Sequence, residues 1–414
     1  MSLRYSKYVD SGVPWLGDVP AHWTTRPLWS MFERIKDVGH PDEQMLSVFR
    51  DYGVVTKDSR DNINKTAENR NIYQLVHPGW LVTNRMKAWQ GSVGISSLRG
   101  IVSGHYICFA PRHDADSRYL NWLFRSPPYA AGYALQSRGV RIGQAEIDND
   151  LYRVMPVLLP PIEEQCAIAD YLDRETARID TLIEEQQRLI DMLRERRIAT
   201  IAEALDGHEV THLRRLVDSK RPMTYGILQA GEPVEGGIVY IGPSDIVGEG
   251  MSPDKDALRT TAPEIASAYQ RSVLAGGDVV VSIGPAYGKV AVVSEDLAGA
   301  NLTQDTVRVA LRPDIVDTRF VVWALLSRQT AEYWDYQIMG ATFRRLNLGT
   351  LARTPIPFPP IDEQRRIAHY LDEQTAKIDT LIRETERFIE LARERRAALI
   401  TAAVTGQINI LEVA

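Results

Sequence analysis

The sequence predicts an α+β protein in which two globular domains are joined by two long helices that pair as an antiparallel coiled coil. One observation is a segment that occurs twice, at 160–207 and 359–406, with more than half of its positions identical. A second is that apolar residues recur at helical spacing in both copies. A third is that dissimilar sequence rich in glycine and β-branched residues precedes each copy. The pattern indicates pseudo-two-fold internal symmetry and four regions, 1–157, 158–207, 208–357 and 358–414.

Each repeated segment is predicted to be one uninterrupted helix. It begins with a double proline, which suits the lead-in or first turn, and acidic residues follow where the helix dipole favours them. RERR comes late in the segment, and a glycine suited to a C-cap, Gly207 or Gly406, stands at its end. Because so long an apolar stripe must be covered, the economical partner of each helix is the other copy. The alternative is that each helix packs only on its neighbouring domain.

The two regions in front of the helices are predicted to share a plan. GWLVTNRMKAWQGSVGISS and GDVVVSIGPAYGKVAVVSE both read as a strand, a Gly-rich loop and a second strand. YLNWLFRS and FVVWALLS place Trp122 and Trp323 on a helix at nearly the same distance before the double proline. SRGVRIG and MGATFRRLNLG are corresponding loops. Similar helices with diverged domains indicate two readers of different targets on related frames.

Composition excludes several classes of protein. The 414-residue chain is 44% hydrophobic, as in ordinary globular proteins, and contains no apolar run near the roughly 18–20 residues of a membrane span. Its N-terminus lacks the apolar segment of a secretion signal. Cys108 and Cys166 are the only cysteines, which favours a reduced, cytoplasmic protein.

The net charge of −6 is unevenly distributed. The acidic excess concentrates in the repeated segments, whereas region 1–157 is mildly basic. This distribution permits DNA binding by the non-repeated regions without requiring it. It also indicates that a partner protein supplies part of any grip on phosphates.

Two short motifs suggest chemistry that their surroundings do not support. SPPY, at Ser126 to Tyr129, matches a motif of amino-methyltransferases, but no Gly-rich cofactor loop accompanies it, so a turn ending the Trp122 helix is predicted. GPAYGKV, at Gly284 to Val290, has too few residues between its glycines for a phosphate loop, and valine follows the lysine. A tight loop between strands is predicted. Histidine and cysteine lack ligand spacing, so neither a catalytic nor a metal site is expected.

The doubled PPI-x-EQ…I-x-YLD…T-x-ID-TLI segment and the opening VDSGVPWLGDVPAHW resemble the specificity subunits of type I restriction-modification systems over essentially the whole chain. The resemblance implies a non-catalytic subunit whose regions 1–157 and 208–357 are target-recognition domains. Each reads one half of a split double-stranded DNA site, and the helices set the gap and dock two modification (methyltransferase) subunits. Restriction (endonuclease) subunits complete the complex. No cofactor is expected in this chain, because S-adenosylmethionine, ATP and magnesium belong to the partners.

The predicted DNA contacts are polar, basic or aromatic residues on Gly-marked loops. Arginine pairs well with guanine, and asparagine or glutamine with adenine. The candidates are Arg85, Lys87, Trp89, His105, Tyr106, Arg138 and Arg141 in the first domain, and Tyr287, Lys289, Asn301, Gln304, Arg344 and Arg345 in the second. A rival interpretation is a coiled-coil scaffold that binds other proteins rather than DNA. The repeat fits either function, and the opening segment and the divergence between the domains favour DNA.

Overall fold

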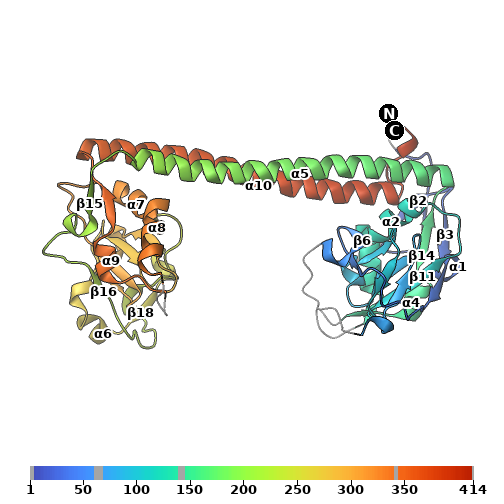
Figure 1. Ribbon diagram of the computed structural model, residues 1–414, viewed down its shortest axis with the longest axis horizontal. Coiled ribbons are helices and arrows are strands. Elements are labelled where there is room, and N and C mark those ends of the chain that lie inside the picture. Colours follow the sequence, from blue (N-terminus) through green and yellow to red (C-terminus); the bar gives the residue numbers. More distant parts are fainter. Residues whose placement is uncertain (1–3, 60–68, 139–144, 340–343, 413–414) are drawn as a thin grey trace. The chain divides into compact units, whose positions relative to one another are not determined.

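The computed structural model describes residues 4–59, 69–138, 145–339 and 344–412. The chain divides into two compact units, which are described separately. Unit 1 comprises Met1–Gln187 and Arg387–Ala414, and unit 2 comprises Arg188–Glu386. Two uninterrupted helices, α5 (Ile162–Leu205) and α10 (Ile361–Val404), contribute one part each to both units (Figure 1). The prediction of two long helices is confirmed, with ends within two residues of the predicted ones.

The centre of unit 1 is a four-stranded antiparallel sheet with the strand order β4-β11-β8-β9. Its strands are β4 (Phe32–Ile35), β11 (Tyr106–Pro111), β8 (Leu81–Asn84) and β9 (Val93–Ile95). Antiparallel pairs flank it: β5 (Leu46–Phe49) with β6 (Gly53–Thr56), β7 (Gln74–Val76) with β10 (Gly100–Val102), β14 (Pro156–Leu159) with β3 (Thr24–Pro27), β12 (Ser137–Arg138) with β13 (Glu146–Ile147), and β1 (Tyr8–Asp10) with β2 (Asp18–Pro20). The helices are α1 (Leu28–Met31), α2 (Ser117–Arg125), α3 (Pro127–Leu135) and α4 (Asn149–Arg153).

Unit 2 has a second four-stranded antiparallel sheet, with the order β16-β22-β19-β20. Its strands are β16 (Thr224–Tyr225), β22 (Thr306–Val309), β19 (Val279–Ser282) and β20 (Val290–Val292). Beside it, β17 (Ile238–Ile241) pairs antiparallel with β18 (Arg259–Thr261) and parallel with β21 (Asn301–Leu302), while β15 (Val210–His212) pairs with β23 (Pro355–Pro357). The helices are α6 (Pro263–Ser267), α7 (Thr318–Leu326), α8 (Arg328–Gln337) and α9 (Leu348–Ala352).

The two units repeat one order of elements. In each, a helix with a central tryptophan (α2 or α7) is followed by a second helix (α3 or α8), a short helix (α4 or α9), an edge strand (β14 or β23) and the long helix. The sheets also have equivalent orders. The predicted strand–loop–strand segments are β8 with β9 and β19 with β20. The predicted fold class is therefore confirmed.

The long helices pair antiparallel within each unit. In unit 1, Ile168 and Leu172 of α5 share a buried apolar core with Ile400 and Val404 of α10. In unit 2, Ile201 and Leu205 share a core with Leu371, together with the sheet and α7. The domain and the helix pair thus share one continuous core in each unit. The predicted pairing of the long helices and the alternative, packing on the neighbouring domain, therefore both occur.

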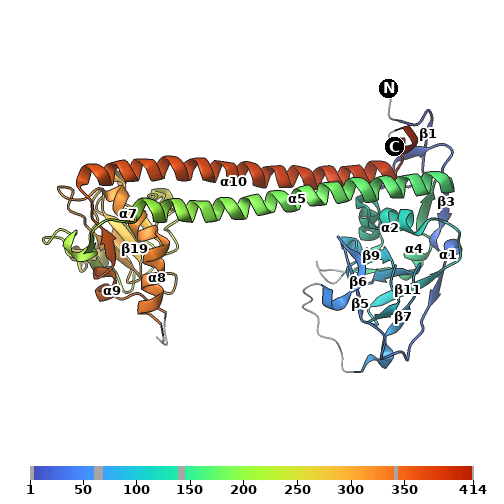
Figure 2. The same cartoon turned by 45° about the horizontal axis from the view of Figure 1, so that its top comes forward.

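A four-residue joint fastens each tryptophan helix to the helix pair. In unit 1 the Trp122 indole N–H donates to Asp173 at 2.8 Å, and the Arg396 guanidinium lies 5.9 Å from the Trp122 ring centroid. Arg396 in turn binds Asp180 through two hydrogen bonds of 2.8 and 3.0 Å. The aspartates come from α5 and the arginine from α10, so one joint ties three helices together. Figure 2 shows α2 beneath the helix pair.

Unit 2 builds the same joint with the roles of the two long helices exchanged. The Trp323 indole donates to Asp372 at 2.9 Å, and Arg197 lies 5.8 Å from the ring centroid and 3.0 Å from Asp379. The repeated YLD, ID and RERR motifs therefore encode one joint twice.

The repeated EQ dipeptide connects each domain to the start of its long helix. The amide oxygen of Gln165 accepts a 2.9 Å hydrogen bond from the N–H of Asp116, the N-cap of α2. Its amide nitrogen donates to the Pro160 carbonyl at 2.8 Å. Gln364 makes the same two bonds in unit 2, to Asp317 and Pro359, at the same distances. Both glutamines are buried, so the pattern requires an amide at this position.

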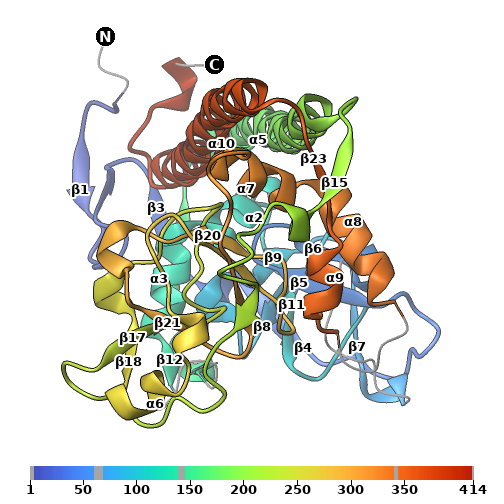
Figure 3. The same cartoon turned by 90° about the vertical axis from the view of Figure 1, so that its left-hand side faces the viewer.

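The opening segment is specific to unit 1. Trp23 donates to Glu164 at 2.9 Å, and the Trp15 ring packs edge-on against Tyr129 with centroids 4.8 Å apart. The Tyr8 hydroxyl donates to the Gly406 carbonyl at 2.7 Å, which ties β1 to the end of α10 (Figure 3). Among the described residues, no helix is both long and apolar enough to cross a membrane.

Candidate nucleic-acid interface

In unit 1, three separate segments meet where β8 ends. The backbone N–H of Arg85 donates to the His105 carbonyl at 3.0 Å, and its carbonyl accepts from Ile147 at 3.1 Å. The Arg85 guanidinium forms an ion pair with Glu146. The predicted residues Arg85 and His105 therefore lie together, although Arg85 is already paired.

The loop after Arg85 presents unequal candidates. Lys87 is exposed, whereas Trp89 is half-buried and its indole donates to the Met86 carbonyl at 3.1 Å. His105 is exposed at the neighbouring turn. Burial raises the pKa of Tyr106, whose hydroxyl is bonded to Ser47 and Asn84. Lys87 and His105 are thus available to a ligand, while Trp89 and Tyr106 support the loops.

Arg138 lies on β12, which pairs with β13. Strand β13 also contains Ile147, whose N–H donates to the Arg85 carbonyl. Its side chain is 76% exposed and forms a 2.9 Å ion pair with Asp148 at the start of α4. An exposed pair of this kind contributes little to stability, and a phosphate or base can replace the carboxylate. Arg141 lies outside the residues that the structure describes.

In unit 2 the equivalent edge is formed by the β19–β20 loop, the β21–β22 loop and the chain that enters α9. Leu346 N–H donates to the Ile283 carbonyl at 3.0 Å, as Ile147 does to Arg85 in unit 1. The Tyr287 hydroxyl donates to Asp335, and this hydrogen bond raises the pKa of Tyr287. Lys289 is exposed, with its ammonium 3.0 Å from the Pro243 carbonyl.

Arg344 and Arg345 lie beside these loops and are both exposed. Arg345 binds the Gln304 carbonyl at 2.8 Å and pairs with Asp305 at 3.1 Å. Arg344 forms no ion pair within the described ranges, and its positive charge opposes the rise in the pKa of Tyr287. Arg344 is therefore the more available cation of the two.

Asn301 differs from the other candidates. It is fully buried; its amide oxygen accepts from Ser272 and from the Leu302 N–H, and its amide nitrogen donates to the Tyr269 carbonyl. A side chain with no exposed surface offers nothing to a base edge in this arrangement. Gln304, two residues before β22, is half-buried and contributes its carbonyl to Arg345.

The two motifs that suggested chemistry have structural roles. SPPY ends α2, as predicted, and also begins α3: Ser126 lies between the two helices and its hydroxyl donates to the Leu123 carbonyl at 2.6 Å, while Pro127 to Tyr129 form the first turn of α3 and Tyr129 is fully buried. GPAYGKV is the tight loop between β19 and β20, in which the Ser282 hydroxyl holds the Ala286 carbonyl at 2.8 Å. Cys108 and Cys166 are both free, and burial raises the pKa of Cys108 to about 12. The described part of the chain holds no cluster of residues able to bind a metal.

One cationic group was not anticipated from the sequence. Arg50, Arg125 and Arg393 line a pocket of unit 1 together with the joint residues. A signal existed, because YLNWLFRS has an arginine where FVVWALLS has Leu326. The spatial meeting of Arg393 with the other two was not encoded in any local pattern.

Comparison with known proteins gives consistent results. Residues 232–390 match the family described as Type I restriction modification DNA specificity domain. The Type I restriction enzyme EcoBI specificity subunit of Escherichia coli is 26% identical over 279 residues, covering 61% of this chain and 58% of the relative. The MjaVIII specificity subunit of Methanocaldococcus jannaschii is 22% identical over 299 residues, 67% of each chain. The alignment therefore spans less than two thirds of the EcoBI subunit.

Solved structures show the same fold. A chain from a study of complex assembly and conformational transition of the type I R-M system has a TM-score of 0.73 and 16% identity, covering 94% of this chain and 99% of that one. The crystal structure of the HsdS subunit from Thermoanaerobacter tengcongensis has a TM-score of 0.57 and 18% identity, covering 94% and 98%.

Proposed function

Because this chain is a relative of the specificity subunits of type I restriction-modification systems, as the sequence predicted, we propose that it directs such a complex to a bipartite DNA site. The globular part of each unit reads one half of the site. The observation that carries the proposal is one frame built twice with different loops at the same edge of the sheet.

The equivalent edges differ in the side chains they offer. Unit 1 presents Lys87, His105 and Arg138, whereas unit 2 presents Lys289 and Arg344. Each well-placed side chain contributes about 1–3 kcal/mol of discrimination against a wrong base. Each set contains a lysine on the loop between the paired strands and an arginine, but only unit 1 adds a histidine and the arginines lie on different segments, so the two half-sites are expected to differ in sequence.

The long helices set the gap between the half-sites. A helix of 44 residues is about 66 Å long, and half-sites one turn of DNA apart lie about 34–36 Å from centre to centre. An uninterrupted helix can therefore fix both the separation and the rotational phase of two readers.

The same helices dock the modification subunits through apolar side chains. Large apolar residues on the long helices are exposed in each unit: Leu182, Phe388 and Leu391 in unit 1, and Leu189, Met192, Ile198, Tyr370 and Leu381 in unit 2. Apolar residues in this number on a paired helix mark a protein interface rather than a solvated face. We assign these apolar faces to the docking of two methyltransferase subunits, and restriction subunits join the complex. S-adenosylmethionine, ATP and magnesium act in those partners.

An exchange of domains tests the proposal. Replacing residues 1–157 with the corresponding region of another family member is expected to change one half of the methylated motif and leave the other half intact. Sequencing the methylated adenines of the host genome measures both halves at once. Alteration of both halves, or of neither, contradicts the division into two readers.

A further inference from the structure

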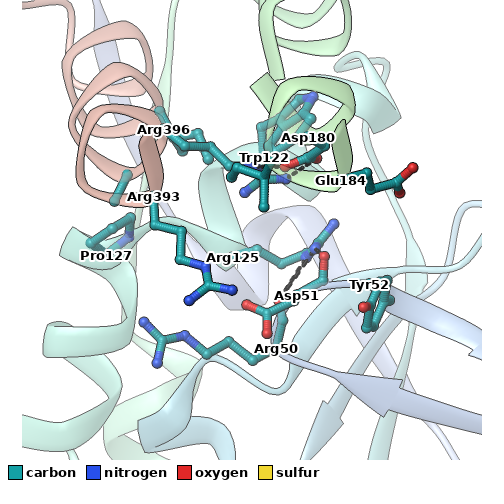
Figure 4. Close-up of a pocket in the computed structure, with 13 residues that line it drawn as sticks. Arg50, Asp51, Tyr52, Trp122, Arg125, Pro127, Asp180, Glu184, Arg393 and Arg396 are labelled. Atoms are coloured by element: carbon teal, nitrogen blue, oxygen red, sulfur yellow. Dashed lines mark hydrogen bonds and ion pairs between the residues drawn. The ribbon is translucent and has the colours of Figure 1, made fainter. Parts of the chain in front are cut away.

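Unit 1 contains a pocket of about 570 Å³ between α2, the β5–β6 turn and the helix pair. Its charged lining includes Arg50 from the turn, Arg125 from the end of α2, and Arg393 and Arg396 from α10 (Figure 4). Four guanidinium groups from three separate segments therefore converge on one cavity.

Two of these arginines are held in position by the fold. Arg396 is bound by Asp180 in the joint. Arg125 donates to the carbonyls of Arg50 and Asp51, and burial, assisted by the charge of Arg396, lowers the pKa of Arg125 to about 10. Arg125 therefore stays protonated at neutral pH, and no carboxylate in the described part of the chain forms an ion pair with it.

The other two arginines, Arg50 and Arg393, are not held in this way. Arg50 and Arg393 are exposed to the pocket and have no ion pair among the residues described. Figure 4 shows their guanidinium groups on the same side of the pocket, with the Asp51 side chain beside them. Two like charges that line the same cavity repel, and an anion between them removes the repulsion.

The carboxylates of the lining offset only part of this positive charge: the charge of Asp51 acts on Arg125. Besides Asp180, the lining includes Asp51 and Glu184, and neither forms an ion pair with a described residue. The Glu184 side chain extends away from the guanidinium groups of Arg50 and Arg393 in Figure 4. Three arginines outside the joint against two carboxylates leave the cavity with excess positive charge.

In unit 2, a carboxylate of the chain itself neutralises positive charge at the position equivalent to this pocket. There Arg197, the equivalent of Arg396, binds Glu249 as well as Asp379. Glu249 precedes Gly250, which pairs beside β20. In unit 1 the residue before the matching Gly53 is Tyr52, so the chain supplies no carboxylate at that point.

We propose that the arginine pocket of unit 1 binds a phosphate group through Arg50, Arg125 and Arg393. Guanidinium groups bind phosphate oxygens through paired, charge-assisted hydrogen bonds, and several donors suit an anion with several oxygens better than a single carboxylate. The phosphate belongs either to the DNA backbone or to a free phosphate compound. The first source rests on the proposed function, and the second does not.

The free-phosphate arm uses the full chain and inorganic phosphate, titrated against chloride at equal ionic strength. Wild-type protein is expected to bind phosphate saturably, and Arg50→Ala or Arg393→Ala to weaken binding about tenfold. Arg395→Ala, an exposed arginine on the same helix outside the pocket, is the matched control. Tyr52→Glu places a carboxylate where unit 2 has Glu249 and is expected to abolish binding.

The DNA arm uses the assembled complex. If the phosphate belongs to DNA, Arg393→Ala is expected to reduce the slope of log affinity against log salt by about one, with the recognised sequence unchanged. Arg395→Ala is expected to leave the slope as in the wild type.

The proposal is overturned if Arg50→Ala and Arg393→Ala match the Arg395→Ala control in both arms. It is also overturned if these variants impair subunit assembly instead, because the occupant is then an acidic protein segment. A wild-type complex that binds no DNA refutes the proposed function, and the free-phosphate arm still decides the pocket. Melting temperatures equal to the wild type show that the variants fold.

Discussion

Unit 1 and unit 2 fasten their domains to the helices through the same joint but enclose it differently. Trp323 is 1% exposed and its arginine binds two carboxylates, whereas Trp122 is half-buried and borders the arginine pocket. The duplicated motifs therefore specify the contacts of the joint, and the diverged loops decide how much water reaches it.

The largest difference is expected between the two tryptophans. Trp323→Ala should lower the free energy of unfolding by about 3–5 kcal/mol, because loss of a fully buried indole leaves a cavity and removes one of the hydrogen bonds of Asp372, which keeps its ion pair with Arg319. Trp122→Ala should cost less, since part of its surface is already in water. Urea unfolding of the full-length variants measures both losses. Equal losses show that the loops do not alter the joint.

The glycines that end the long helices provide a second comparison. Gly207 and Gly406 both have positive φ, of 77° and 70°. A Cβ on Gly207 meets nothing within 4 Å, but one on Gly406 lies 2.4 Å from Pro20. Both alanine variants should lose about 1–2 kcal/mol to backbone strain, and Gly406→Ala about 1–3 kcal/mol more to overpacking. Thermal unfolding measures the difference, and a larger loss for Gly207→Ala contradicts the packing of the opening segment on α10.

Two exposed arginines test the proposed role of the sheet edge of unit 2 in DNA binding. Replacing Arg344 and Arg345 with alanine should weaken DNA binding by the assembled complex by about 1–3 kcal/mol and leave assembly intact. Arg344→Ala alone should account for most of the loss, because Arg345 is held by Asp305. DNA titrations at fixed salt measure the affinity. Wild-type affinity of the double variant removes both residues from the proposed edge.

The smallest expected effect is a pH dependence of protein stability that arises from a histidine of unit 1. Burial lowers the pKa of His113, which packs against Phe32, while the matching position of unit 2 is the exposed Asp314. Unfolded histidine has a pKa of about 6.5, so the unfolded chain takes up the proton first as pH falls. The contribution to stability is present above pH 6.5 and lost below it. The free energy of unfolding, measured from pH 7.5 to 5, should fall less steeply in His113→Gln than in the wild type. Identical pH profiles of the two proteins contradict a contribution from His113.

Much of the frame was predictable because it is encoded locally. The double proline, the apolar spacing and the terminal glycine mark helix ends that agree with α5 and α10 within two residues. The segments around Trp122 and Trp323 were matched correctly, since helix and strand patterns span few residues. The loops that follow β8 and β19 were also located, because glycines mark where strands end.

The availability of each candidate was not predictable. Asn301 and Gln304 lie in the same Gly-marked segment, yet one is fully buried and the other half-buried. Arg85 and Arg344 look alike as basic loop residues, but only Arg85 meets a carboxylate. Such outcomes depend on residues distant in the chain, whose positions no local pattern contains.

The sequence by itself determined the two long helices, the repeated plan of the domains and the motifs of the joint, because periodicity and near-identical repeats act over short stretches of chain. Only the tertiary structure decided which loop side chains remain available and that Arg50, Arg125 and Arg393 share one pocket. The physical reason is that burial and charge pairing arise from contacts between segments far apart in sequence, and these exist only once the domain has packed on the helix pair.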